Sequence, residues 1–98
     1  MFARVATYNI DSDRIEGAIG AFTEALDRIR TLDGFVEGVI LVAPDESKML
    51  SVTYWESRRA MESSSVAASR ARTEAARAAD GVVESSCEYR IALRVSGQ

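Results

Sequence analysis

The sequence has no histidine and, in 98 residues, only one cysteine, one proline and one tryptophan. Without histidine, haem iron cannot be ligated by imidazole and a Ser–His–Asp set cannot form. The single cysteine, Cys87, cannot form a disulfide within the chain, so nothing suggests a secreted disulfide scaffold. We also find no acid pair, no metal-ligand cluster and no glycine-rich phosphate loop, and hydrolase and kinase functions therefore have no support.

Basic residues do not exceed acidic ones: 12 Lys and Arg stand against 15 Asp and Glu, a net charge of −3. This balance argues against nucleic acid or an anionic membrane as the main partner, because phosphate binding needs a basic excess. Residues 1–11 lack the pattern of a signal peptide, and no apolar run approaches the roughly 20 residues of a membrane span. We expect a cytoplasmic protein whose partners are small molecules or proteins.

The hydrophobic pattern predicts four strands and two helices in the order β-α-β-β-α-β. Short stretches rich in β-branched and aromatic residues predict the strands, and apolar residues three or four apart predict the first helix. The expected strands span residues 2–9, 35–43, 49–55 and 86–95; the expected helices span residues 13–29 and 58–79. Residues 35–43 are almost continuously apolar and predict a buried strand, and Pro44, Asp45, Glu46 and Ser47 supply a turn.

Local signals predict where the helices begin and end. Asp13 and Glu16 have the spacing of a capping box for the first helix, and Gly34 lies past its end. Ser57 is placed to cap the second helix, and Gly81 to end it. Three serines inside the second helix lower its propensity and make a kink or brief loop plausible; they are Ser63, Ser64 and Ser65. In the last strand Tyr89, Ile91, Leu93 and Val95 share one face, opposite Glu88, Arg90 and Arg94.

This order predicts a single α+β domain over residues 1–98 with the ferredoxin-like βαββαβ fold, an antiparallel sheet with both helices on one face. The other face then exposes apolar side chains such as Leu50, Val52 and Tyr54. An open apolar sheet face is an aggregation hazard. We therefore expect a homodimer that packs sheet on sheet into a dimeric α/β barrel.

Several segments make the chain resemble the antibiotic biosynthesis monooxygenase-like (ABM) proteins of the dimeric α+β barrel superfamily. They are Gly34-Phe35, the segment 51–57 (SVTYWES), Ala60-Met61 and the first helix with Phe22 in its stripe. The resemblance implies a pocket between helices and sheet that holds a flat hydrophobic ligand. It also implies oxygenase chemistry without metal or flavin, in which a deprotonated polycyclic phenol reacts directly with oxygen.

A haem-degrading branch of the same group uses an Asn, a Trp and a His. The resemblance places Ala6, Ser64 and approximately Thr73 at these three positions, so all three functional side chains are missing. Haem degradation is therefore not expected.

Five residues are candidates for ligand binding: Trp55, Arg4, Tyr8, Asn9 and Phe22. Trp55 could stack on a flat ligand or fill the core, and Arg4 could hold an anion, pair with Glu or reach solvent. Tyr8 and Asn9 end the first strand and could donate hydrogen bonds to a phenolate, although Asn9 also suits a plain turn. Tyr54 should point to the dimer face.

Two features of the second helix have alternative interpretations. Its arginines stand beside glutamates and predict a solvated face rather than an anion site; they are Arg58, Arg59, Arg70, Arg72 and Arg77. Its alanines permit either close packing or a cavity.

The leading hypothesis is a cofactor-independent monooxygenase acting on a polycyclic or phenolic molecule. The alternative is a non-catalytic dimeric module that binds a small hydrophobic ligand or a protein partner.

Overall fold

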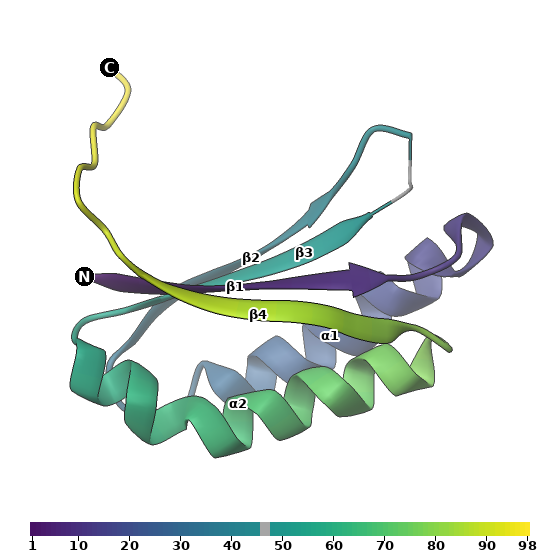
Figure 1. Ribbon diagram of the computed structural model, residues 1–98, viewed down its shortest axis with the longest axis horizontal. Coiled ribbons are helices and arrows are strands. Elements are labelled where there is room, and N and C mark those ends of the chain that lie inside the picture. The colour runs from purple at the N-terminus through teal and green to yellow at the C-terminus, as the bar shows by residue number, and fades with distance from the viewer. Residues whose placement is uncertain (46–47) are drawn as a thin grey trace.

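A computed structural model describes residues 1–45 and 48–98 (Figure 1). The elements follow the predicted order, with one short 3₁₀ helix, η1, before the first α-helix. Their bounds are β1 Phe2–Asn9, η1 Ser12–Arg14, α1 Ile15–Ile29, β2 Phe35–Val42, β3 Met49–Trp55, α2 Arg58–Ala78 and β4 Val82–Arg90.

The four strands form one sheet in the order β2-β3-β1-β4, and every neighbouring pair is antiparallel. Both helices cover the same face of this sheet, and the opposite face carries no helix (Figure 1). The α+β fold with a ferredoxin-like βαββαβ order is therefore confirmed. In the part of the chain that is described, we find no helix of the length and apolar character needed to cross a membrane.

The first helix begins differently from the prediction. Asp13 lies inside η1 rather than at a cap, and neither Asp11 nor Arg14, which precede η1 and α1, makes a side-chain capping bond. The predicted capping box is wrong because a 3₁₀ turn, closed by Arg14 N–H donating to Asp11 O at 2.9 Å, connects the strand to the helix. The apolar stripe is confirmed, since α1 buries Ala18, Phe22 and further residues of that face against the sheet.

The second helix is capped as predicted and runs unbroken through the three serines. The Ser57 hydroxyl accepts the Ala60 N–H at 3.1 Å. At the other end, Asp80 rather than Gly81 adopts the left-handed conformation, with φ 54°. The Gly81 N–H then donates to Ala76 O at 2.8 Å, which closes the last turn.

The second strand is an edge strand, so the prediction of a buried strand is wrong. Its partner on one side is β3, and Val36 and Leu41 remain exposed. The apolar run arises because both faces of β2 carry apolar side chains although only one is covered in this protomer. Of the predicted turn, Glu46 and Ser47 lie outside the described residues; Pro44 and Asp45 form a turn.

The last strand begins four residues before the predicted start and ends at Arg90, five residues short of the predicted end. The physical reason is that β1, its pairing partner, begins at Phe2: the final contact is Ile91 N–H donating to Met1 O at 2.9 Å. Beyond this point the chain has no strand to pair with, and Leu93 and Val95 are exposed.

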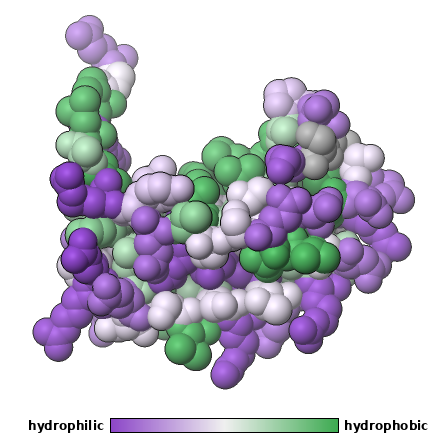
Figure 2. All heavy atoms as spheres, viewed as in Figure 1, coloured by the Kyte–Doolittle hydropathy of each residue, from purple (hydrophilic) through white to green (hydrophobic). Residues whose placement is uncertain are grey.

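The hydrophobic core lies between the helices and the sheet. Its largest fully buried side chains come from β1, α1 and β3; they are Trp55, Tyr8, Phe22, Ile29 and Met49. The opposite sheet face pairs Leu41 with Leu50 and Val39 with Val52. Figure 2 shows hydrophobic atoms along the C-terminal tail and on the side of the sheet away from the helices.

Candidate functional site

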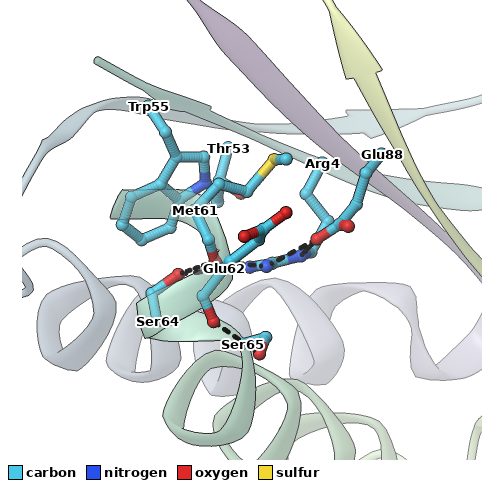
Figure 3. Close-up of polar contacts among 8 residues, drawn as sticks. All are labelled: Arg4, Thr53, Trp55, Met61, Glu62, Ser64, Ser65 and Glu88. Atoms are coloured by element: carbon cyan, nitrogen blue, oxygen red, sulfur yellow. Dashed lines mark hydrogen bonds and ion pairs between the residues drawn. The ribbon is translucent and has the colours of Figure 1, made fainter. Parts of the chain in front are cut away.

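A buried polar cluster surrounds Arg4 under the first half of α2 (Figure 3). Arg4 is 3% exposed, and it points from β1 toward the helix. Its Nη2 donates to Met61 O at 2.7 Å and to Glu88 Oε2 at 2.9 Å, and its Nε also reaches Glu88 at 3.3 Å. The alternative in which Arg4 pairs with a glutamate therefore describes the protomer, because Glu88 lies directly opposite on β4.

Ser64 connects this cluster to the surface. Its hydroxyl donates to Met61 O at 2.7 Å and lies 3.5 Å from Arg4 Nη1. Ser64 also lines an open pocket of about 570 Å³ between the residues before β2 and the start of α2. The pocket wall is mainly polar; it consists of Leu32, Asp33, Gly34, Glu56, Ser57, Arg59, Ala60, Ser63 and Ser64.

Backbone geometry shapes this pocket at Gly34. Gly34 has φ +79°, and a Cβ at this position would overlap the Cβ of Ala60. Its carbonyl accepts the Glu56 N–H at 2.8 Å, which fixes the end of β3 beside the start of β2. A side chain here would push α2 away from the pocket floor.

Tyr8 and Phe22 lie deep in the core. Their rings meet edge to face with centroids 4.6 Å apart, and the Tyr8 hydroxyl lies 2.8 Å from the Ser51 hydroxyl. Burial raises the pKa of Tyr8 above its ordinary value; the Ser51 hydrogen bond and the charge of Arg72 oppose that shift. The phenol therefore stays neutral at physiological pH and can donate a hydrogen bond but does not serve as a base.

Trp55 is fully buried and held by protein contacts. Its Nε1 donates to Thr53 Oγ1 at 3.0 Å, and its ring meets Phe35 edge to face at 5.4 Å. The Arg4 guanidinium carbon lies 5.8 Å from the centre of the same ring. Trp55 therefore fills the core, which was one of the two predicted alternatives. Ligand stacking on Trp55 remains a prediction that would require these contacts to rearrange.

The structure brings the five sequence candidates together in two pairs and leaves one apart. Arg4 lies over Trp55, and Tyr8 packs on Phe22. Asn9 is exposed at the end of β1, where it pairs with β4.

Arg72 is a buried residue that the sequence pattern did not single out. We expected it on a solvated face with four other arginines, but it is 6% exposed, and its Nε and Nη1 are buried without a hydrogen-bond partner among the described residues. The prediction is wrong because α2 turns this position toward the sheet. The sequence spacing could have indicated this inward position, because residues four apart share one helix face and Arg72 lies midway between Ala68 and Ala76.

The three positions aligned with the haem-degrading branch carry Ala6, Ser64 and Thr73 instead of Asn, Trp and His. Ala6 and Ser64 are buried, whereas Thr73 is exposed on the outer side of α2. The inward-facing neighbour of Thr73 is Arg72, and a guanidinium has no lone pair to offer iron.

Solved structures with the same fold span essentially the whole chain. They include a mutant form of SnoaB from Streptomyces nogalater, a cofactor-independent oxygenase, with 14% identity, TM-score 0.78 and coverage of 98% of this chain and 97% of that one. The heme-degrader MhuD from Mycobacterium tuberculosis has 19% identity, TM-score 0.74 and coverage of 98% and 100%. Rv0793 from the same organism has 14% identity, TM-score 0.72 and coverage of 97% and 98%. At these identities the likeness establishes the fold alone.

No protein of curated function matches the sequence significantly. The sequence model of the family described as "Antibiotic biosynthesis monooxygenase" matches residues 1–66. Since this match covers most of the chain and includes β1, α1, β2, β3 and the pocket at the start of α2, the protein belongs to the antibiotic biosynthesis monooxygenase family.

Proposed function

We propose that the protein is a cofactor-independent monooxygenase acting on a polycyclic or phenolic small molecule. The observation that carries the proposal is the polar wall of the pocket and its link through Ser64 to buried Arg4. Proton removal and orientation of a hydroxyl require polar groups in the pocket, whereas a wall of purely apolar residues would favour binding alone. The volume of about 570 Å³ suits a ligand of two or three fused rings.

The reaction requires the protein to supply only a proton acceptor and groups that orient the substrate. A carboxylate of the pocket wall, Asp33 or Glu56, accepts a proton from the substrate, and the resulting electron-rich anion reduces oxygen. One oxygen atom bonds to the ring carbon as a peroxide, and the O–O bond then breaks. The second oxygen leaves as water with the hydrogen lost from that carbon and the proton returned by the carboxylate, and the carbon becomes a ketone. Ser64, as a hydrogen-bonding group on the pocket floor, orients the substrate oxygen.

One observation favours the alternative of a non-catalytic binding module. Trp55, Tyr8 and Phe22 are all engaged within the core, so none presents a free aromatic face to a ligand in the protomer. A ligand would then bind through the outer pocket alone.

We further infer that the protein is a homodimer. The sheet face opposite the helices carries Val39, Leu41 and Leu50, and Leu41 is 50% exposed. No helix of the described chain covers this face, and a second copy packed against it by twofold symmetry would remove the exposed apolar area from water.

Oxygen consumption tests the oxygenase proposal. Purified protein is mixed with anthrones and dihydroquinones without flavin or metal, and an oxygen electrode records uptake. We expect one oxygen molecule per substrate oxidised, and a roughly two- to tenfold slower rate in Ser64→Ala, the range for losing one neutral hydrogen bond.

Ser65→Ala is the matched control, because Ser65 also donates to the carbonyl three residues back, that of Glu62, but does not line the pocket. Its rate should equal that of the unchanged protein. Ligand binding by a folded protein that consumes no oxygen with any substrate would favour the binding module instead.

A further inference from the structure

Two arginines are buried between α2 and the sheet, and they differ in whether their hydrogen-bond donors have acceptors within the chain. All three guanidinium nitrogens of Arg4 have acceptors, supplied by Glu88, Met61 and Ser64. Arg72 is buried almost as deeply, yet its Nε and Nη1 have none within the described residues. A buried guanidinium with two unmet donors is costly, so its retention calls for an acceptor from outside the chain.

Among the described residues, none of the charged groups that act on Arg72 is an anion free to neutralise it. Residues paired on adjacent strands share one sheet face, and the row Ser51, Ala6, Ser86 carries small neutral side chains on the face that α2 covers. Tyr8, near this row, stays neutral because burial raises its pKa. The acidic group with an effect on Arg72 is Glu88, whose carboxylate is already held by Arg4.

The charge count indicates what the acceptor is. Arg4 and Arg72 contribute two buried positive charges and the half-exposed Glu88 one negative charge, which leaves one positive charge unbalanced. Burial most strongly lowers the pKa of Arg72; Tyr8, when ionised, opposes this shift, Arg4 adds to it, and Glu88 opposes it. Because a guanidinium does not lose its proton in proteins, a monoanion from outside would complete the balance.

A ligand that reaches Arg72 from the pocket would pass along the inward face of α2. Ser64, Ala68 and Arg72 lie four residues apart on the inward face of α2, and all are buried. Long helical side chains commonly slant toward the helix N-terminus, and the Ala68 methyl group takes little space between Arg72 and Ser64. Ser64 is the residue shared by the pocket and the buried cluster.

We propose that Arg72 recognises the anionic oxygen of an aromatic monoanion, a carboxylate, phenolate or enolate, that enters through the Ser64 pocket and lies between α2 and the sheet. That the ligand is aromatic rests on the proposed function. The anion preference does not require turnover, so binding and oxygen uptake can fail independently.

The experiment compares 2-naphthoate with its neutral isostere 2-naphthamide by calorimetric titration of the full chain. We expect naphthoate to bind at least about tenfold more tightly. Arg72→Gln should weaken naphthoate binding by about 10- to 100-fold, the range for a charge-assisted hydrogen bond, and leave naphthamide binding unchanged. Arg70→Gln, on the exposed side of the same helix, is the matched control and should bind both as before.

A stability measurement separates recognition from a structural role. Arg72→Met should raise the ligand-free melting temperature, because it removes an uncompensated buried charge, and should abolish the thermal shift that naphthoate gives the unchanged protein. The proposal is overturned if the unchanged protein binds no naphthoate or binds both compounds equally, if Arg72→Gln keeps the preference, or if both Arg72 variants are less stable than the unchanged protein.

Discussion

At the residue scale, environment rather than residue type decides what each arginine does. Arg4 and Arg72 are both buried, but Arg4 lies opposite Glu88 on the neighbouring strand, while two buried nitrogens of Arg72 have no acceptor among the described residues. The first is a satisfied structural ion pair, and the second retains unused hydrogen-bond donors. The guanidinium is thus paired within the chain at Arg4 and keeps unmet donors at Arg72.

Two glycines give a prediction at this scale. Gly34→Ala should lower the free energy of unfolding by about 2 to 4 kcal/mol, because alanine is strained at positive φ and its Cβ would overlap Ala60. Gly20→Ala is the control: Gly20 is exposed in α1 with nothing near its Cβ position, so alanine should stabilise by about 0.5 to 1 kcal/mol. Urea denaturation at one fixed protein concentration measures both. Equal effects of the two substitutions would contradict the assigned role of Gly34.

At the element scale, each segment ends where its hydrogen-bonding partners end. The N-terminus of α2 is fixed by the Ser57 side chain, its C-terminus by Gly81 donating to Ala76, and β4 by the start of β1 at Phe2. Helix α2 therefore spans the sheet from the pocket to the end of β1 without interruption.

Removal of the Ser57 cap is the prediction that belongs here. Ser57→Ala should destabilise the protein by about 1 kcal/mol, because the Ala60 N–H loses its acceptor. Ser69→Ala, at an exposed position inside α2, should be neutral or slightly stabilising, since alanine has the higher helix propensity. The midpoint of a urea titration distinguishes them. A neutral Ser57→Ala would mean that water replaces the cap at no cost.

At the scale of the whole molecule, the helices protect one sheet face and leave the other bare. The exposed apolar residues Leu41, Tyr89 and Leu93 lie on that face or on the tail that follows it. This surface is an aggregation hazard for a single chain, and the proposed dimer would remove it from water.

Light scattering at micromolar concentration tests the dimer. We expect twice the mass of one 98-residue chain. Leu41→Arg should shift the protein toward a monomer, because it would bury a charge between the two sheets. Val66→Arg replaces an equally apolar residue that is 71% exposed on α2 and should leave the mass unchanged. A monomeric unchanged protein would refute the dimer.

The sequence by itself determined the order of elements and the ends marked by local chemistry. The bounds of β1 and β3, the apolar stripe of α1 and the cap at Ser57 all follow from patterns within a few residues, because strand alternation, helix periodicity and capping are short-range effects. Resemblance at the segment 51–57 supplied the family, and the family match confirmed it.

Only the tertiary structure decided the edge position of β2, the end of β4 and the fates of the buried polar groups. Pairing order depends on which strands meet in space, and residues 91–95 keep a strand-like pattern without a partner to pair with. Arg4 finds Glu88 across 84 positions of sequence, and Arg72 finds no acceptor among the described residues, because the packing of α2 over the sheet sets both environments. Burial and charge balance are properties of this packing, which local sequence does not encode.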